Sequence, residues 1–199
     1  IDDTLLQDDF EADRGWLPGG SASSGAFVRA DPNGCTSASL GPIRPENDTT
    51  AAPGRLCWIT GNPAPSTSCP PNGGDVTNGT VWVRSPRFDA PAGGRLLLDF
   101  SRWLTLTGRS FGGTLEYRAE ASADDGLNWT TVDVSSGNFA AWSRVHLEMT
   151  GFVPPSPQTR VRFVAREQLG YGTASTVLAV DDVKLVCRAL CAKSRARSY

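Results

Sequence analysis

The sequence predicts an all-β protein, a two-sheet antiparallel β-sandwich of the jelly-roll type with little helix. From residue 95 onward, short runs of alternating apolar and polar residues recur between turn-forming residues, and the 21 glycines and 14 prolines are spread without a period. Alternation of this kind places one side of each strand in a core, and several such strands in series indicate a sandwich. With 199 residues, 39% of them hydrophobic, the chain can bury a core as one domain. We expect residues 1–186 to form this domain and residues 187–199 a basic, cysteine-containing tail.

The strands follow one another at short intervals. In the segment 114–120, Leu115, Tyr117 and Ala119 alternate with charged residues, as in a half-buried antiparallel strand. Asp124-Asp125-Gly126 predicts a tight turn after it. The N-terminal third is looser, and its long loop 61–78 is expected to be functional or pinned. The expected strands are 26–29, 55–60, 81–84, 95–104, 114–120, 128–132, 142–147, 160–165 and 176–186.

Two acidic clusters lie near opposite ends of the chain, Asp8-Asp9-Phe10-Glu11 and Asp181-Asp182, each at the edge of a strand-like run. Carboxylates so close together repel one another, and they lose hydration when partly buried. A hard cation such as Ca²⁺, which takes six to eight oxygen ligands, would offset that cost and would tie the first strand to the last. The alternative is that they are solvated turn and edge charges.

The five cysteines indicate disulfides in an oxidising compartment. None forms a CxxC pair, and with a single histidine in the chain a Cys/His zinc site is not expected. We expect Cys57 to pair with Cys69 across a Pro-rich loop. For the rest, either Cys35 joins one of the C-terminal pair or Cys187 bonds Cys191, and one cysteine stays free or pairs outside the chain.

No catalytic or cofactor-binding residue is predicted. His146 alternates with apolar residues on an expected strand without a nucleophile motif, which favours a structural histidine. The carboxylates Asp124 and Asp125 fit hairpin chemistry better than glycoside hydrolysis. Six tryptophans suggest stacking on sugar rings. Trp58, Trp82 and Trp103 are expected in the core, whereas Trp16, Trp129 and Trp142 are freer to face solvent.

Charge and hydropathy exclude several partners. The formal net charge of −2 gives no electrostatic reason to expect nucleic acid. No apolar run approaches the roughly 20 residues that span a bilayer, so membrane insertion is not expected. The chain starts at Ile1, as a mature or excised segment would. These features and the cysteines predict an extracellular protein, secreted or at the cell surface.

A series of short motifs carries a family resemblance across residues 8–186. The series is Asp9-Phe10-Glu11, Gly15-Trp16, 47–50, Gly54, 57–62, 74–79, 83–89, the Ser-x-Asp-x-Gly-x-x-Trp pattern of 122–129, 161–165 and 179–183. Their order resembles that of MAM-like, choice-of-anchor J and cleaved-adhesin jelly-roll domains of secreted and cell-surface proteins. The chain departs from animal MAM domains in lacking their regular cysteine arrangement.

The resemblance implies a structural Ca²⁺ near the strand termini, held by Glu11, Asp48, Asp75 and Asp181 or Asp182, with Asp181 preferred. It also implies a non-catalytic, calcium-stabilised adhesion or recognition module that binds a glycan or a partner protein of the cell surface, accessory to a larger secreted protein. A structural subunit of an extracellular homopolymeric assembly, with possible self-association through the odd cysteine and the basic tail, is the first alternative. A polysaccharide-active enzyme is a distant one.

Overall fold

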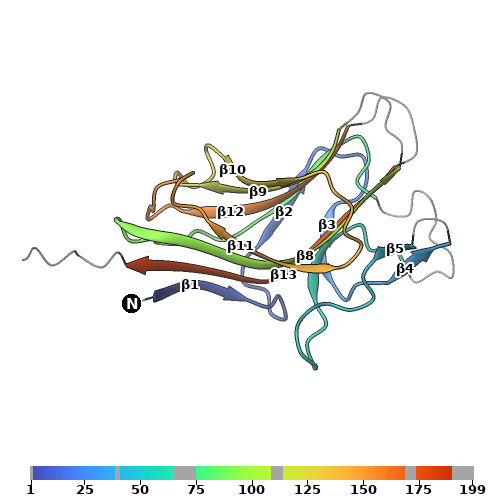
Figure 1. Cartoon of the computed structure of the whole chain (residues 1–199), viewed down its shortest axis with the longest axis horizontal. Helices are drawn as coiled ribbons and strands as arrows, with labels where there is room; N and C mark the ends of the chain where they lie inside the picture. Colours follow the sequence, from blue (N-terminus) through green and yellow to red (C-terminus); the bar gives the residue numbers. More distant parts are fainter. Residues whose placement is uncertain (1, 39–40, 65–74, 109–113, 169–173, 190–199) are drawn as a thin grey trace, which may run out of the picture.

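The chain folds as two antiparallel sheets packed face to face (Figure 1). The computed structural model describes residues 2–38, 41–64, 75–108, 114–168 and 174–189, and these contain thirteen strands and no helix. The six-stranded sheet has the order β11-β8-β13-β6-β3, with β1 beside β13, and the five-stranded sheet has the order β10-β9-β12-β7-β2. The strands of the first sheet are β1 (Asp2–Asp8), β3 (Phe27–Ala30), β6 (Cys57–Thr60), β8 (Gly94–Gly108), β11 (Trp142–Glu148) and β13 (Ala174–Ala189). Those of the second are β2 (Leu17–Gly20), β7 (Gly79–Arg84), β9 (Thr114–Ser122), β10 (Thr130–Ser135) and β12 (Arg160–Gln168).

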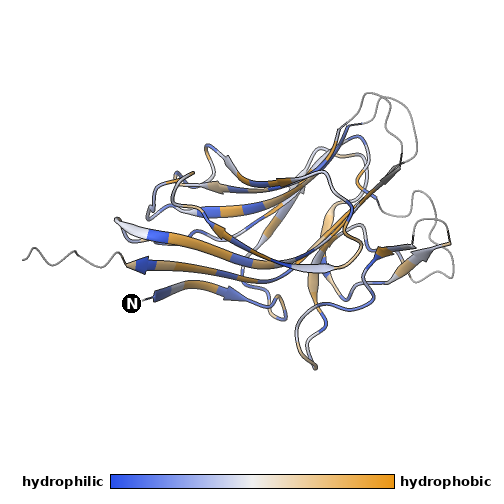
Figure 2. Cartoon of the chain, in the orientation of Figure 1, coloured by the Kyte–Doolittle hydropathy of each residue, from blue (hydrophilic) through white to orange (hydrophobic). Residues whose placement is uncertain are grey.

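The core lies between the sheets and is built by the alternation visible in the sequence. Figure 2 shows hydrophobic and hydrophilic residues alternating along the strands. Phe100 of β8 and Phe163 of β12 meet across the interface with ring centroids 4.8 Å apart, and Trp16 stacks on Phe163 at 6.1 Å. Aromatic pairs at such distances add to the free energy of burial. The all-β sandwich predicted from the sequence is confirmed.

A bulge in β13 decides how the six-stranded sheet is assembled. The β13–β8 register shifts between Asp181 and Lys184, and Asp182 has φ +49°, a left-handed conformation that aspartate tolerates better than most residues. Before the bulge Leu178 and Val180 enter the core between the sheets, and after it Val183 and Leu185 do. The inserted residue therefore keeps Asp182 out of the core. β13 pairs with β6 before the bulge and with β1 after it.

Half of the outer face of the six-stranded sheet is covered. The short strands β4 (Cys35–Ser37) and β5 (Gly41–Arg44), which were not expected from the sequence, pair with each other beside this face. Ile43 of β5 joins a second apolar cluster there with Cys57, Ile59, Trp103, Val177 and Ala179. Trp103 donates its indole N–H to the Ile43 carbonyl at 3.1 Å. This layer removes that surface from solvent.

Two expectations about the ends and the cysteines need correction. β13 runs to Ala189, so Cys187 is a buried core residue and not part of a tail; residues 190–199 lie outside the described part. Cys57 and Cys187 are free thiols, so the expected bonds Cys57–Cys69 and Cys187–Cys191 are wrong. Cys57 is fully buried in the second apolar cluster, and Cys69 lies outside the described residues. Cys35 is disulfide-bonded, to a partner outside the described residues.

We predict that Cys57 acts as a small apolar core residue. Cys57→Ala should cost about 1 kcal/mol of the free energy of unfolding, whereas Cys57→Ser should cost roughly 1–3 kcal/mol more, because the hydroxyl would be buried among apolar side chains. Urea unfolding of the two variants measures the difference. Equal losses of about 2–5 kcal/mol for both variants, as removal of a disulfide would give, would contradict it.

A second prediction concerns Glu167, which β12 places on the core side, 1% exposed, near Thr176 of β13 and the Asp75 carboxylate. Burial, and secondarily the charge of Asp75, raises its pKa to about 7. Because the folded-state pKa lies above the ordinary 4.5, the stability that a protonated Glu167 contributes is fully present below pH 4.5 and is lost as the pH rises through 7.

Glu167→Gln should therefore remove roughly 2 kcal/mol of the loss in unfolding free energy between pH 5 and pH 8. Denaturant titrations at both pH values measure this, with Glu46→Gln, at an exposed position, as the matched control. A pH dependence identical in wild type and Glu167→Gln would show that Glu167 is not the titrating group.

Candidate functional site

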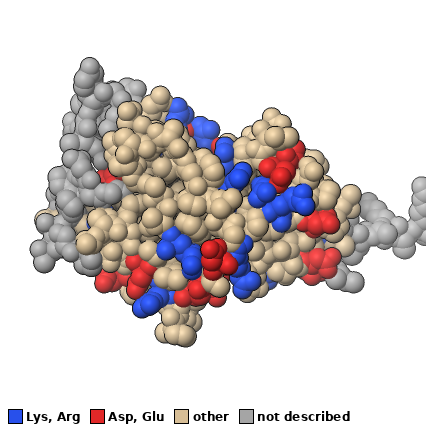
Figure 3. Space-filling view, turned by 180° about the vertical axis from the view of Figure 1, so that it is seen from behind, with Lys and Arg blue, Asp and Glu red and all other residues tan. Residues whose placement is uncertain are grey.

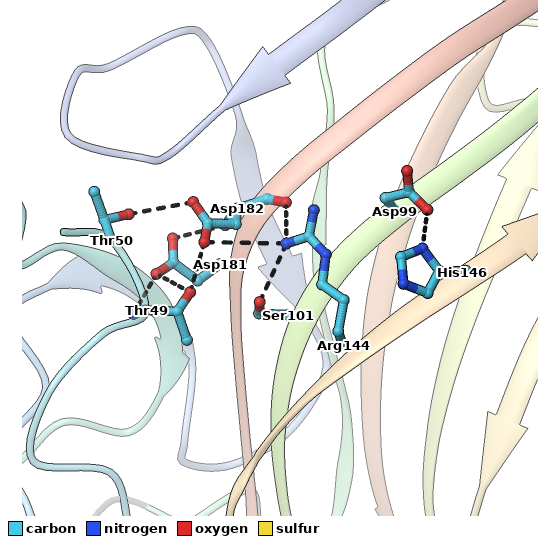
Figure 4. A network of polar contacts seen from close by, with 8 residues as sticks. All are labelled: Thr49, Thr50, Asp99, Ser101, Arg144, His146, Asp181 and Asp182. Atoms are coloured by element: carbon cyan, nitrogen blue, oxygen red, sulfur yellow. Dashed lines mark hydrogen bonds and ion pairs between the residues drawn. The ribbon is translucent and has the colours of Figure 1, made fainter.

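The β13 bulge carries one candidate site, shown in Figure 4. Asp181 is fully buried, and burial raises its pKa to about 7. Thr49 donates its backbone N–H at 2.8 Å and its hydroxyl at 2.9 Å to Asp181 Oδ2, and Thr49 and Thr50 also donate their hydroxyls to Asp182. From the other side Arg144 donates to the Asp182 carbonyl and to the Ser101 hydroxyl (Figure 4). The residues that follow Asp48 thus cap both acids of the bulge.

Of the five acids expected to hold calcium, the structure brings four into this region. The Asp48 pKa is raised by burial first and then by the charges of Glu11 and Asp182, which places these carboxylates near one another. Glu11 Oε1 accepts the backbone N–H groups of Arg55 and Leu56 at 2.8 and 2.6 Å. Asp48 Oδ2 is buried and has no hydrogen-bond partner.

Asp75 does not belong to this group. The residue after it, Val76, donates its backbone N–H to the carbonyl of Thr176, which lies five positions before Asp181 on β13. At about 3.3 Å per residue the two positions are roughly 16 Å apart. Asp75 lies instead near Arg44 and Glu167. Within the described residues no three His, Cys, Asp or Glu side chains form a group that could hold a metal ion by themselves.

The groups considered for catalysis have hydrogen-bond partners within the fold. His146 is 70% exposed and its Nδ1 lies 2.5 Å from Asp99 Oδ1, apart from the Arg144 network (Figure 4). Asp124 accepts hydrogen bonds from Asn128 and Ser122, which lower its pKa to about 2, so it is ionised at neutral pH and cannot act as a general acid. It lies in the expected turn, where Asp125 has φ +63°.

The outer face of the five-stranded sheet carries a second candidate site, and strand register places its residues in three rows. We call it the arginine–tryptophan face. The first row crosses the strands as Leu17, Arg84, Arg162 and Glu120; the second as Gly19, Trp82, Val164, Arg118 and Val134; the third as Thr80, Arg166 and Glu116. These positions alternate with core residues such as Val81, Val83 and Phe163. The face therefore presents four arginines, two glutamates and an indole.

A hollow of about 220 Å³ lies at the middle of this face. Its apolar floor is Val164, and its walls are Thr80, Glu116, Arg118, Glu120, Arg162 and Arg166. Glu120 accepts from Arg162 at 2.6 Å, and Glu116 accepts from Arg118 at 2.6 Å and from Arg166 at 3.4 Å. The charged wall groups are thus held by one another before any ligand arrives, which lowers the entropy cost of binding.

Trp82 lies across β2 at Gly19. A Cβ at Gly19 would fall 2.3 Å from the Trp82 ring, so only glycine leaves room for the indole in this position. Trp129 lies at the other border of the face, where the guanidinium of Arg162 covers its ring at 4.2 Å. Trp82 and Trp129 are both partly exposed. Trp82 supplies an apolar ring surface, and Trp129 positions Arg162.

The division of the tryptophans into buried and exposed residues differs from the expectation. Trp58 and Trp103 are buried as expected, and Trp129 and Trp142 are partly exposed, but Trp82 is also partly exposed and Trp16 is in the core. The signal for Trp82 is in the sequence: in Val81-Trp82-Val83-Arg84 the two valines share one face, so Trp82 must share the other with arginine. Trp16 is held inside by its indole N–H, which donates to buried Asp8 at 2.9 Å.

The surface charge is mixed in sign. Figure 3 shows basic and acidic side chains next to one another on the side of the molecule behind Figure 1. No patch of one sign of the size that a nucleic-acid backbone requires is seen in this view. The described residues contain no helix that could span a membrane.

The fold is similar to that of several solved structures, although no protein-family model and no curated protein sequence matches the chain. One is the CBM22-1–GH10 modules of endo-1,4-beta-D-xylanase 10B of Clostridium thermocellum complexed with xylohexaose: 11% identity, TM-score 0.52, covering 98% of this chain and 30% of that one. A second is a structure of carbohydrate-binding modules of the β-sandwich superfamily: 12% identity, TM-score 0.51, coverage 89% and 60%. A third is the K3 cleaved adhesin domain of Lys-gingipain from Porphyromonas gingivalis w83: 17% identity, TM-score 0.45, coverage 92% and 98%. The first two likenesses establish the β-sandwich fold, and membership of the MAM-like or choice-of-anchor J domains stays a prediction.

Proposed function

We propose that the protein is a non-catalytic glycan-recognition module of the extracellular space, and that the arginine–tryptophan face is its binding surface. The observation that carries the proposal is the pre-ordered hollow over Val164 beside the indole of Trp82. Sugar rings present apolar C–H faces to aromatic rings and hydroxyl groups to charged side chains. The face offers both on adjacent strands. The fold likeness to carbohydrate-binding modules supports the proposal.

The ion pairs and the small volume of the hollow favour glycan binding over catalysis. Glu116 and Glu120 are both paired with arginines, so both carboxylates already have charged partners. The hollow is smaller than the roughly 300–1,000 Å³ of enclosed ligand pockets, as expected for a surface that contacts part of a longer polymer. A polysaccharide-active enzyme would need a free acid pair.

We predict that displacing Trp82 weakens glycan binding and leaves the fold intact. Trp82→Ala removes the stacking surface, and Gly19→Ala drives the ring away by steric overlap, so both should weaken binding at least about tenfold. Binding is measured by affinity electrophoresis against a panel of neutral and acidic plant and bacterial polysaccharides.

The matched controls are Phe152→Ala, which removes an exposed aromatic ring outside the face, and Gly151→Ala, where an added Cβ meets nothing within 4 Å. Both should bind as wild type does. If wild type binds no polysaccharide in the panel, or if Trp82→Ala binds unchanged, this assignment of the face is wrong.

We also propose that Ca²⁺ stabilises the end of the sandwich at the β13 bulge. The supporting observation is Asp48 Oδ2, which is buried without a hydrogen-bond partner beside Glu11 and Asp182. Carboxylate, hydroxyl and backbone carbonyl oxygens are the ligands that calcium prefers, and all three kinds are present here. Asp48 would be the first ligand, with Glu11 and Asp181 or Asp182 supplying further carboxylates. The ion would link the loop 47–50 to β13 and to the segment after β1.

Calcium should therefore raise the melting temperature of protein first stripped of metal. An ion that binds only the folded state at a hundredfold excess over Kd adds about 2.7 kcal/mol, a shift of several degrees for a domain of this size. Asp48→Asn and Asp181→Ala should abolish the shift, and Asp89→Asn, an exposed aspartate, should not. Superimposable melting curves in EDTA and in excess calcium would identify these acids as ordinary edge charges.

A further inference from the structure

Two arginines of the arginine–tryptophan face oppose one another. Arg84 of β7 is in direct register with Arg162 of β12, and both lie on the outer face. Like charges directly opposite on antiparallel strands destabilise the pair. Arg162 is compensated, since its Nε donates to Glu120 at 2.6 Å and its guanidinium covers Trp129 at 4.2 Å.

Arg84 has no carboxylate partner within the described residues. It takes part in none of the ion pairs there, and its Nε is buried without a hydrogen-bond partner. Its guanidinium lies 5.6 Å from the centre of the Trp82 ring. The opposition of two like charges costs free energy, and an anion beside the terminal nitrogens of Arg84 would offset that cost.

We infer, on the basis of the proposed function, that the glycan is acidic and that Arg84 binds the carboxylate of a uronate residue that lies beside Trp82. A guanidinium presents pairs of N–H groups as a planar fork that matches a carboxylate. The Nε of Arg84 is buried, so its two terminal nitrogens, which make no hydrogen bond within the described residues, are the fork that a ligand could reach. The surrounding charges agree, because the three rows hold four arginines against two glutamates.

The test uses the whole chain and three probes: polygalacturonate, the same polymer after chemical reduction of its carboxyl groups, and dextran sulfate. Wild type should bind polygalacturonate at least about tenfold more tightly than the reduced polymer, and added NaCl should weaken only the first interaction. Arg84→Gln should lose at least about tenfold on polygalacturonate. Arg84→Lys, which keeps the charge but loses the fork, should lose less than Arg84→Gln.

The matched control is Arg55→Gln, which makes the same change of charge at an exposed arginine before β6 of the other sheet, and it should bind as wild type does. A melting curve without ligand reports the folded state: Arg84→Gln should melt at or above the wild-type temperature, because the substitution removes a like-charge pair. If the Arg84→Gln variant does not fold, the view that the charge of Arg84 has no stabilising partner in the fold is wrong.

The remaining outcomes separate this inference from the proposed function. Equal affinity for native and reduced polymer, with Trp82→Ala still defective, leaves glycan binding in place and overturns the assignment to uronates. Dextran sulfate bound as tightly as polygalacturonate also overturns it, since the site would then respond to charge alone. If the wild-type protein binds no polysaccharide, neutral or acidic, the proposed function itself is wrong.

Discussion

The pairing of β13 with β8 is the constraint on which the rest of the molecule depends. β13 runs through the middle of the six-stranded sheet and contacts β6 along its first half and β1 along its second. A sixteen-residue strand cannot keep two consecutive aspartates out of the core by simple alternation, because every second residue must point inward. The bulge at Asp182 solves this by adding one residue on the outer side.

That local solution organises the neighbouring segments. Asp181 is buried and needs donors, which Thr49 supplies from a loop far away in the sequence. The segment after β1 also approaches, since Glu11 accepts two backbone N–H groups just before β6. The end of the first strand, the loop 47–50 and the last strand therefore meet at one place because a bulge placed two carboxylates there.

The two outer faces of the sandwich differ in how they meet solvent. The six-stranded sheet carries apolar residues outward at Ile59, Trp103 and Val177, and the β4–β5 pair covers them. The five-stranded sheet carries arginine and glutamate outward and has no covering layer among the described strands. Apolar outer residues require a cover, whereas charged ones do not. The outer face of the five-stranded sheet therefore stays open along the described strands.

The sequence predicted the strands from residue 95 onward well, because period-two alternation is a local property. It predicted β2, β4 and β5 poorly, because Leu17–Gly20 and Gly41–Arg44 hold glycine and proline and become strands only by pairing with segments elsewhere. The resemblance implied that Glu11, Asp48 and the β13 acids hold one ion; the structure brings these carboxylates near one another, and the ion itself stays a prediction. The position of Asp75 and the thiol of Cys57 were not, because both depend on register, which composition does not contain.

The arrangement of charges on the open face follows from the same register. Shifting β7 by two residues against β12 would keep every side chain on its face, yet Arg84 would no longer oppose Arg162 and would lie beside Val164 instead. The observed register is selected by the core, where Val81 and Val83 pack between the sheets. A shift would change the core partners of Val81 and Val83, which are Ala165 and Phe163 in the observed register, and the cost of the resulting misfit exceeds that of a screened pair of like charges at the surface. The packing of the core can therefore keep Arg84 opposite Arg162 despite their like charges. Arg84, which has no carboxylate partner within the described residues, is then in a position where the proposed anion could bind.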